Sequence, residues 1–265
     1  MKRRITFGFS PCPNDTFQFH ALVHGLVDTG GIDFVPHIAD VEELNRLALA
    51  GELEVTKASY GVLGKILPDY SLLRSGGALG RGCGPLWVTK GDQSAEELAV
   101  QPIAHPGVNT TAHFLLQLRL KNNFTGVPLV FDEIMAKVAS GEIPSGVIIH
   151  EGRFTYRKMG LTLVEDLGGW WEKTTGAPIP LGCIVLRRDV APVTPLEIEE
   201  ILRRSLRFAW ENPEASKAWV RSLAQEMEEK VIREHIALYV NDFSLDLGVE
   251  GERAVEILLG AGPGL

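Results

Sequence analysis

The sequence has few cysteines and no long apolar run. Only Cys12, Cys83 and Cys183 are present, and no two of them form a Cys-x-x-Cys pair. An odd number of widely spaced cysteines predicts free thiols in a reducing compartment rather than a disulfide framework. No window approaches the ~18 uninterrupted apolar residues that a membrane-spanning helix needs, so no membrane partner is expected.

Basic charge is also scarce. Lys and Arg total 26 of 265 residues against 34 Asp and Glu, which gives a formal net charge of −8. This balance argues against general nucleic-acid binding and against attachment to an anionic membrane, although a local basic pocket for a small anion stays open. Hydrophobic residues make up 45% and charged residues 23%, the proportions of a globular protein.

The first residues do not form a complete signal peptide. Met1–Arg4 would suit the start of one, but the apolar stretch that follows runs only from Ile5 to Phe9. A signal peptide needs an apolar core of roughly 7–15 residues, so we expect a cytoplasmic protein.

Motifs for metals and nucleotides are missing as well. His20 and His24 share a helix face, but Ala21 replaces the Glu that a zincin requires, and no third ligand is evident. The run Gly80–Gly84 superficially resembles a dinucleotide-binding loop, yet it lacks the Gly-x-Gly-x-x-Gly spacing, and no Walker A sequence occurs. Neither a metal nor a cofactor is therefore expected.

What the sequence does contain is alternation of short apolar runs with helical patterns. Alternation of this kind predicts an α/β fold built from βαβ units with largely parallel sheets. The expected strands are residues 4–9, 32–37, 54–59, 86–90, 100–104, 127–131, 146–149, 161–164 and 183–187. The expected helices are residues 14–27, 40–50 (with Asp40 and Glu43 in the form of a capping box), 60–67, 110 onward, 132–140, 196–211, 213–227, 229–239 and 250–259.

Two segments are suited to carry the chain between two α/β lobes. Ser75–Pro85 contains five glycines, and Pro178, Pro180 and Gly182 precede the strand at 183–187. We therefore expect a discontinuous first lobe, residues 1–86 and 187–265, with an inserted second lobe, residues 87–186. Clefts between lobes and at the carboxyl ends of strands are common ligand sites, so the loops after strands are the candidates.

The first such loop is Ser10–Phe17, in which two prolines precede Asn14 and Asp15 at the start of a helix. Free N–H groups at a helix start can bind a carboxylate, although these residue types serve equally well as an ordinary cap. The second segment is 56–60, at the end of the strand at 54–59, where Lys57 near Ser59 could bind an anion as a point charge or could simply be solvated. Asn45 on the preceding helix could face the same cleft or water.

The third and fourth loops come from the expected second lobe. In Pro106–Ala112 a Pro-Gly turn leads into a helix with Thr110 and Thr111 at its start, which suits a carboxylate or a diol. In the fourth, an apolar strand ends in His150. A histidine at the end of a buried strand that faces a cleft is placed for proton transfer, since its ordinary pKa is about 6.5. A structural histidine bonded to a neighbour is the alternative.

Taken in order, these loops resemble one known family across nearly the whole chain. The matching stretches are 10–17 with 21–25, Leu44-Asn45-Arg46, 56–60, 73–82, Thr110-Thr111-Ala112, Ile148-Ile149-His150-Glu151, 153–156 and Tyr239-Val240-Asn241. The sequence is similar in these stretches to the 1,4-dihydroxy-6-naphthoate synthases of the futalosine route to menaquinone. The resemblance implies the fold of type 2 periplasmic binding proteins, two α/β lobes hinged around a ligand cleft.

The resemblance also implies a reaction and its residues. Cyclic dehypoxanthinylfutalosine would be converted to 1,4-dihydroxy-6-naphthoate without a redox cofactor or metal. His150 matches the general base of the family. The substrate-contacting positions implied are Lys57, Ala58, Ser59, Thr111, Ala112 and Asn45, and we add Asn14 from the first loop.

Two other functions stay open at this stage. Chorismate dehydratase of the same pathway shares the fold, but the Ser-Pro-Cys-Pro-Asn-Asp-Thr start and the His-Glu pair after a strand favour the synthase. A non-catalytic binding protein for small molecules is the second alternative, against which the cleft histidine argues. The sequence leaves open whether the protein is a monomer or a dimer.

Overall fold

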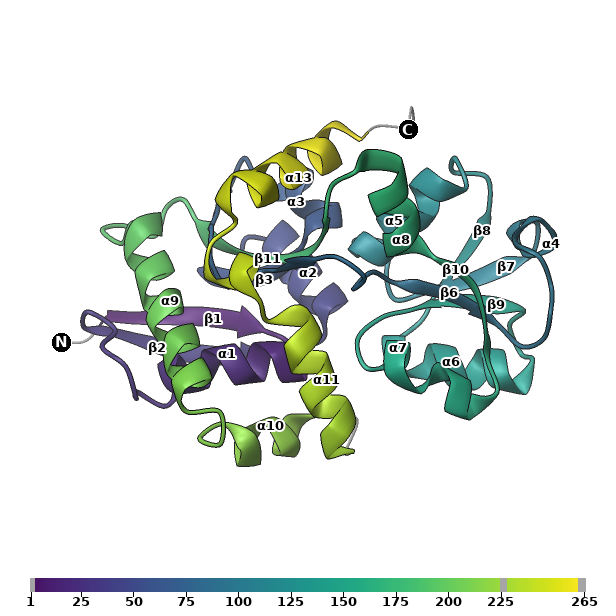
Figure 1. The fold of residues 1–265 in the computed structure, drawn as a ribbon. Coiled ribbons are helices and arrows are strands. Elements are labelled where there is room, and N and C mark those ends of the chain that lie inside the picture. The colour runs from purple at the N-terminus through teal and green to yellow at the C-terminus, as the bar shows by residue number, and fades with distance from the viewer. Residues whose placement is uncertain (1–2, 225–227, 262–265) are drawn as a thin grey trace.

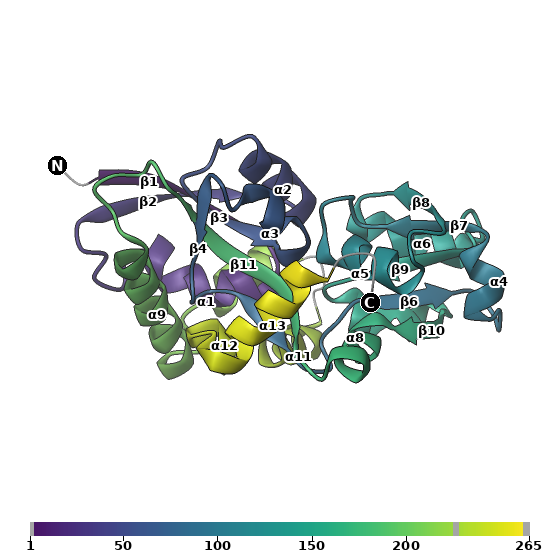
Figure 2. The ribbon, with the colours of Figure 1, turned by 90° about the horizontal axis from the view of Figure 1, so that it is seen from above.

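The fold consists of two lobes, each built on one mixed β-sheet with helices packed around it (Figure 1). The computed structural model describes residues 3–224 and 228–261. Seen from above, the lobes lie side by side, with strands β1 to β4 and β11 in one and β6 to β10 in the other (Figure 2). The predicted α/β class with two lobes is confirmed.

The first sheet has the order β2-β1-β3-β11-β4, and β5 pairs with β11 beside this path. Its strands are β1 (Arg3–Phe9), β2 (Ile32–Ile38), β3 (Val55–Ser59), β4 (Tyr70–Leu72), β5 (Ala78–Gly80) and β11 (Ile179–Arg187). The second sheet has the order β10-β6-β9-β7-β8. Its strands are β6 (Leu86–Thr89), β7 (Pro102–His105), β8 (Thr125–Pro128), β9 (Ser145–Ile148) and β10 (Thr162–Asp166).

The prediction of largely parallel sheets is wrong. Strand β11 runs antiparallel to β3, β4 and β5, and in the second sheet β6 runs antiparallel to both β9 and β10. The reason is the double crossing, because a strand that returns from the other lobe enters the sheet from the opposite end. Residues 179–186, which the sequence division assigns to the inserted lobe, pair within the first sheet.

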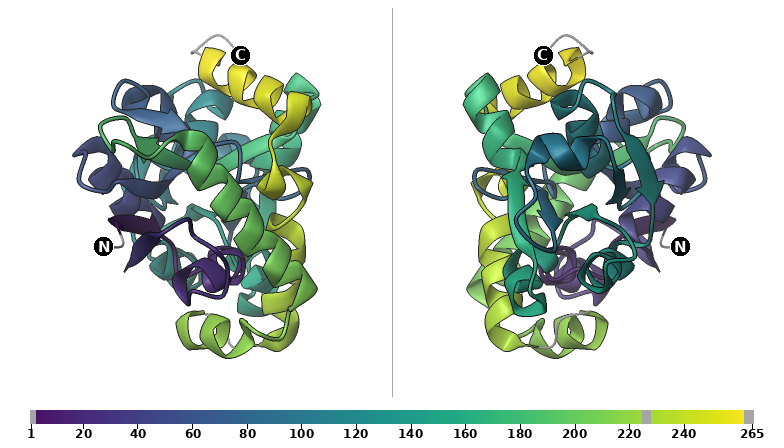
Figure 3. Two further views of the ribbon diagram at one scale, coloured as in Figure 1. Left: turned by 90° about the vertical axis from the view of Figure 1, so that its left-hand side faces the viewer. Right: turned by 90° about the vertical axis from the view of Figure 1, so that its right-hand side faces the viewer.

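Fourteen described helical segments pack against these sheets, and the end-on views show the C-terminal ones along one flank of the molecule (Figure 3). The early ones are α1 (Pro13–Val23), α2 (Val41–Leu49), α3 (Tyr60–Ile66), α4 (Ala95–Ala99), α5 (Thr111–Arg119) and α6 (Phe131–Ser140). They are followed by α7 (Gly152–Thr155), η1 (Tyr156–Met159), α8 (Leu167–Thr175), α9 (Pro195–Glu211), α10 (Lys217–Leu223), α11 (Glu229–Tyr239), α12 (Asp242–Leu245) and α13 (Gly248–Gly260).

Three helix boundaries differ from expectation for local reasons. Helix α1 stops at Val23 instead of residue 27 because Gly25 adopts a left-handed φ of 66°. At the start of α2, the Asp40 carboxylate accepts a hydrogen bond from the Glu42 N–H and caps the helix as expected. The Glu43 carboxylate pairs with Arg46, so the expected capping box is not formed. The helix predicted over 213–227 is shorter in the structure, where α10 runs from Lys217 to Leu223; residues 225–227 lie outside the described part of the chain.

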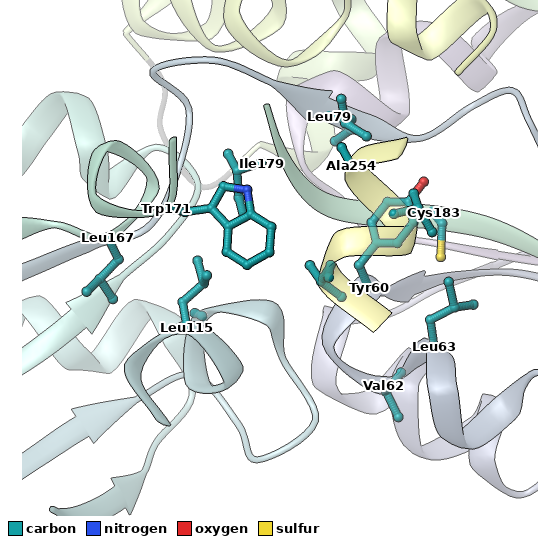
Figure 4. Packing of buried hydrophobic residues seen from close by; sticks show 14 of the residues in the cluster. Tyr60, Val62, Leu63, Leu79, Leu115, Leu167, Trp171, Ile179, Cys183 and Ala254 are labelled. Carbon is teal, nitrogen blue, oxygen red and sulfur yellow. The ribbon is translucent and has the colours of Figure 1, made fainter. Parts of the chain in front are cut away.

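One apolar cluster connects the two lobes. Trp171 of α8 and Leu115 of α5 belong to it together with Tyr60 of α3 and Cys183 of β11 (Figure 4). Trp171 is fully buried, and its indole N–H donates to the Pro178 carbonyl at 3.2 Å. The segment at which the chain returns to the first lobe is therefore embedded in the core.

A buried ion pair holds the loop after β1 against β3. The Asp15 carboxylate is fully buried and accepts hydrogen bonds from the Ser10 N–H at 3.0 Å, the Ser10 hydroxyl at 2.6 Å and the Asn14 amide at 2.8 Å. The Lys57 ammonium, itself 4% exposed, pairs with the same carboxylate. Burial of two charges is tolerated only when both are paired and hydrogen-bonded, and this requirement is met here.

We expect Asp15→Asn to lower the free energy of unfolding by about 3–5 kcal/mol, because it leaves the Lys57 ammonium buried without its counter-ion. Asp33→Asn is the matched control, since the Arg4–Asp33 pair of the same lobe is exposed; this change should cost less than about 1 kcal/mol. Urea unfolding of both variants measures the difference. Equal losses would contradict the structural importance of the buried pair.

The second lobe contains a buried pair of histidines. The rings of His105 on β7 and His113 on α5 lie 4.1 Å apart between centroids. Burial, together with the neighbouring His105, lowers the pKa of His113 to about 4. Gly126 leaves room for this pair, because a Cβ at that position would lie 2.9 Å from the His105 ring.

In the unfolded chain His113 has its ordinary pKa of about 6.5, whereas in the folded chain its pKa is about 4. Between these two pH values the unfolded chain binds more protons, so the free energy of unfolding falls as the pH drops through this window. The contribution is about 3 kcal/mol from this group. We expect His113→Gln to flatten the decline of the free energy of unfolding from pH 7 to pH 4.5, measured by urea titration at each pH. The same substitution at exposed His37 serves as the control, and an unaltered decline in His113→Gln would refute the assignment.

Candidate active site

A cavity of about 580 Å³, counting its open mouth, lies between the lobes. The residues that line it are Asn14, Val41, Lys57, Ser59, Ala78, Cys83, Pro85, Thr110, Thr111, Ala112, Ile149, His150, Leu181, Gly182, His235 and Tyr239. They come from strands β3, β5 and β11 of the first sheet, from helices α1, α2, α5 and α11, and from the segments just before β6 and just after β9. Six of the eight predicted site residues are among them, and Ala58 and Asn45 are not.

The first loop contributes a neutral amide, that of Asn14, which meets the buried imidazole of His235 on α11. Cys12, not Asn14 or Asp15, is the N-cap of α1, so the two residues expected as caps are used elsewhere. Because the Asn14 Nδ2 donates to Asp15, its Oδ1 faces His235 Nε2 at 2.9 Å and accepts the hydrogen carried there. Burial lowers the pKa of His235 well below its ordinary value, so this ring is neutral.

Strand β3 divides its residues between the cavity and the core. Lys57 and Ser59 face the cavity, and Ala58 points to the opposite side, as the alternation of a strand requires. The Ala58 carbonyl accepts from the Cys183 thiol at 3.4 Å. The Lys57 ammonium is already paired with Asp15, so it does not act as an isolated cation.

Asn45 acts beneath the cavity wall rather than in it. Its Oδ1 accepts from the Ser59 N–H at 2.7 Å, and its Nδ2 donates to the Ser59 hydroxyl at 3.0 Å. The same Nδ2 lies 3.2 Å from the Asn109 carbonyl of the second lobe. Asn45 therefore fixes the orientation of Ser59 and connects the lobes.

The N-terminus of α5 forms the opposite wall. Thr110 caps the helix, with its hydroxyl accepting from the His113 N–H at 3.2 Å. The Thr111 hydroxyl donates to the Leu181 carbonyl at 2.7 Å and accepts from the Gly61 N–H at 3.0 Å. Gly61 permits this approach, since a Cβ there would lie 2.8 Å from the Thr110 carbonyl. The backbone N–H groups of the first helical turn have no intrahelical acceptor.

His150 sits in a strained backbone position at the end of β9. Its φ is +55°, in the left-handed region that only a few per cent of residues other than glycine adopt. The Cys12 Sγ lies 3.3 Å from His150 Nδ1, and the Phe131 ring packs edge-on at 5.0 Å between centroids. Burial, aided by the Lys57 charge, lowers the pKa of His150 to about 4, so the ring is neutral at pH 7. Strain of this kind concentrates at functional sites.

Among the residues at this site that the sequence did not predict are His235, Tyr239 and Cys12. His235 and Tyr239 stand one turn apart on α11 and both line the cavity. Their i,i+4 spacing was the available signal, but nothing local placed α11 beside α1. Cys12 was noted only as part of a rigid turn, and its contact with His150 spans 138 positions.

The arrangement offers an uncharged imidazole, a hydroxyl at Ser59 and helix N–H groups around one cavity. A ligand with a carboxylate and hydroxyl groups fits this set, and the imidazole can accept a proton. Cys12, His150 and Glu151 also present one metal-type donor atom each within 4.8 Å of one another.

No described helix of the chain is long and apolar enough to cross a membrane. A family model described as menaquinone biosynthesis matches residues 5–262. The chain is 50% identical over 252 residues to 1,4-dihydroxy-6-naphthoate synthase of Thermus thermophilus, which covers 95% of this chain and 91% of the relative. It is 44% identical to the synthase of Streptomyces coelicolor over 96% of this chain and 91% of the relative.

A crystal structure of a protein from Archaeoglobus fulgidus superposes with a TM-score of 0.91 at 33% identity, covering 97% of this chain and 96% of that one. The periplasmic aliphatic sulphonate-binding protein of Escherichia coli superposes with a TM-score of 0.67 at 12% identity, covering 98% and 86%. The second likeness shows the fold alone and confirms the type 2 periplasmic-binding-protein architecture. The chain belongs to the menaquinone biosynthesis family, and within it to the 1,4-dihydroxy-6-naphthoate synthases.

Proposed function

We propose that the chain is a cytoplasmic enzyme that converts cyclic dehypoxanthinylfutalosine to 1,4-dihydroxy-6-naphthoate, with His150 as the general base. The observation that carries this proposal is the position of His150, which lines the cavity between the lobes with its Nδ1 against Cys12 Sγ. A neutral imidazole held in this way presents Nε2 to a bound ligand.

The chemistry of the reaction fits these residues. The substrate carries a carboxylate and a sugar-derived polyol. His150 takes a proton from a hydroxyl group, and cleavage of a C–C bond then leads toward the aromatic product with loss of a small sugar-derived fragment. Aromatisation supplies driving force, and a positioned general base typically contributes about 10²–10⁴-fold in rate.

We assign substrate binding to two sides of the cavity, the N-terminus of α5 and the residues of the first lobe that face it. The N–H groups of Thr111 and Ala112 at the start of α5 suit the carboxylate, because the Thr111 hydroxyl is occupied by contacts with Leu181 and Gly61. Ser59, Lys57 and Asn14 on the first lobe suit the polyol. We assign Ala58 a backbone role only and Asn45 the role of orienting Ser59.

The two crossings between the lobes support closure over the substrate. Closure excludes water from the reacting groups and can contribute several kcal/mol through positioning. We propose that contacts such as the 2.8 Å bond from Asn109 Nδ2 to Glu42 of α2 form part of the closed state.

We expect the purified native protein to convert cyclic dehypoxanthinylfutalosine to 1,4-dihydroxy-6-naphthoate, followed by mass spectrometry without added metal or nucleotide. His150→Gln should lower kcat about 10²–10⁴-fold, since it removes the proton acceptor. His24→Gln, at the exposed end of α1, should retain the native rate. Full turnover by His150→Gln would exclude the general-base role. Dehydration of chorismate with no naphthoate product would instead identify the chain as the dehydratase.

The contact between Cys12 and His150 generates a separate prediction. Cys12→Ser keeps a polar atom against Nδ1, whereas Cys12→Ala removes it and frees the ring to rotate. We expect kcat of the alanine variant to fall about ten- to hundredfold with KM nearly unchanged, and the serine variant to stay closer to the native value. Equal kcat values for the two variants would show that the thiol does not orient the ring.

A further inference from the structure

Three donor groups typical of transition-metal sites meet beside the cavity. The Cys12 thiol lies 3.3 Å from His150 Nδ1, and Glu151 follows directly in the chain. One donor atom from each of the three residues lies within 4.8 Å of the other two. Cys12 and Glu151 are buried, and His150 forms the wall of the cavity.

We propose that Cys12, His150 and Glu151 form a binding site for a thiophilic divalent cation, with Zn²⁺ as the best fit, and that occupancy of this site inhibits the enzyme. The cation would be an inhibitor and not a resident cofactor. The binding half of the proposal is independent of the reaction, and the inhibition half rests on the proposed role of His150.

The spacing of the donors supports a tetrahedral site. With Zn–S near 2.3 Å and Zn–N near 2.0 Å, a sulfur and a nitrogen bound to one zinc ion lie about 3.5 Å apart. The observed separation of 3.3 Å between Cys12 Sγ and His150 Nδ1 is close to this value. The three donor atoms lie within 4.8 Å of one another, so the third donor needs to move by about 1.5 Å at most to complete the set. A fourth ligand, such as a water molecule, would complete a tetrahedral site.

The donor set also selects the class of cation. One sulfur, one imidazole nitrogen and one carboxylate oxygen suit Zn²⁺, whereas Mg²⁺ and Ca²⁺ prefer sites made of oxygen alone. A coordinating thiol is deprotonated, so binding releases the Cys12 proton to solvent.

Inhibition follows from the chemistry of imidazole. Coordination through Nδ1 requires the ring hydrogen to reside on Nε2, because neutral imidazole carries one hydrogen. Nε2 is the nitrogen that the proposed reaction uses as the proton acceptor. A cation on Nδ1 therefore converts the base into a hydrogen-bond donor and also occupies space at the cavity wall.

His20 and His24 provide a control for cation binding at a site that has no cysteine. His20 and His24 on α1 lie 4.4 Å apart between ring centroids, and His24 Nδ1 is engaged with the His20 carbonyl. This pair has only imidazole donors, so a cation bound there would show no sulfur ligand. His24→Gln removes it without touching the cavity.

The test uses Co²⁺ as a spectroscopic substitute for Zn²⁺ with the full chain. A thiolate-to-cobalt charge-transfer band in the near ultraviolet should appear with the native protein and His24→Gln, reach its plateau at one equivalent and disappear when Zn²⁺ is added. The band should be lost in Cys12→Ser, and Glu151→Gln should weaken Zn²⁺ binding at least about tenfold. Circular dichroism checks that each variant is folded. If Cys12→Ser fails to fold, weaker cation binding by Glu151→Gln and His150→Gln is the result that tests the site.

Absence of the band in the native protein, or an equal band in Cys12→Ser, would overturn the site. Zn²⁺ should inhibit naphthoate formation by the native protein and His24→Gln over the concentration range in which it displaces Co²⁺, and a chelator should restore the rate. A thiolate–cobalt band without inhibition would uphold the site but contradict the role of His150. A turnover assay that fails for every protein would leave the spectroscopic result to decide the binding proposal alone.

Discussion

The buried carboxylate of Asp15 is the constraint on which the rest of the site depends. It is fully excluded from solvent, so its charge must be balanced within the protein, and Ser10, Asn14 and Lys57 do this together. These partners fix the loop after β1 against β3. Through the Asn14 amide the same network reaches His235 on α11. A charge that cannot be left unpaired therefore positions two walls of the cavity.

The lobes meet through hydrogen bonds as well as through apolar packing. The Thr111 hydroxyl hydrogen-bonds to Leu181 and Gly61 of the first lobe. The Asn45 amide donates to the Asn109 carbonyl of the second lobe. Beneath these contacts one apolar cluster runs without interruption from α3 to α8. Several groups at the cavity wall, among them the Thr111 hydroxyl and the Asn14 amide, therefore already hydrogen-bond within the protein.

His150 combines two chemical properties in one place. Its backbone is left-handed, and the Cys12 thiol contacts its Nδ1, which leaves Nε2 for the proton transfer that we propose. The neighbouring Glu151 adds an oxygen donor, and the three groups together have the composition of a zinc site. The contact between Nδ1 and Sγ thus serves both proposals, because it can orient the ring for proton transfer and can supply two donors to a thiophilic cation.

The sequence by itself determined the local elements, because alternation and helical periodicity are properties of neighbouring residues. It also placed Asn14, Lys57, Ser59, Thr111, Ala112 and His150 at or after the ends of predicted strands, and all six line the cavity. Only the tertiary structure decided that Ala58 faces the core, that Asn45 supports Ser59, and that the Lys57 charge is neutralised by Asp15. It alone brought His235 to Asn14 across 221 positions and turned β11 antiparallel. These outcomes depend on packing between distant segments, and no local pattern of the chain encodes which segments meet.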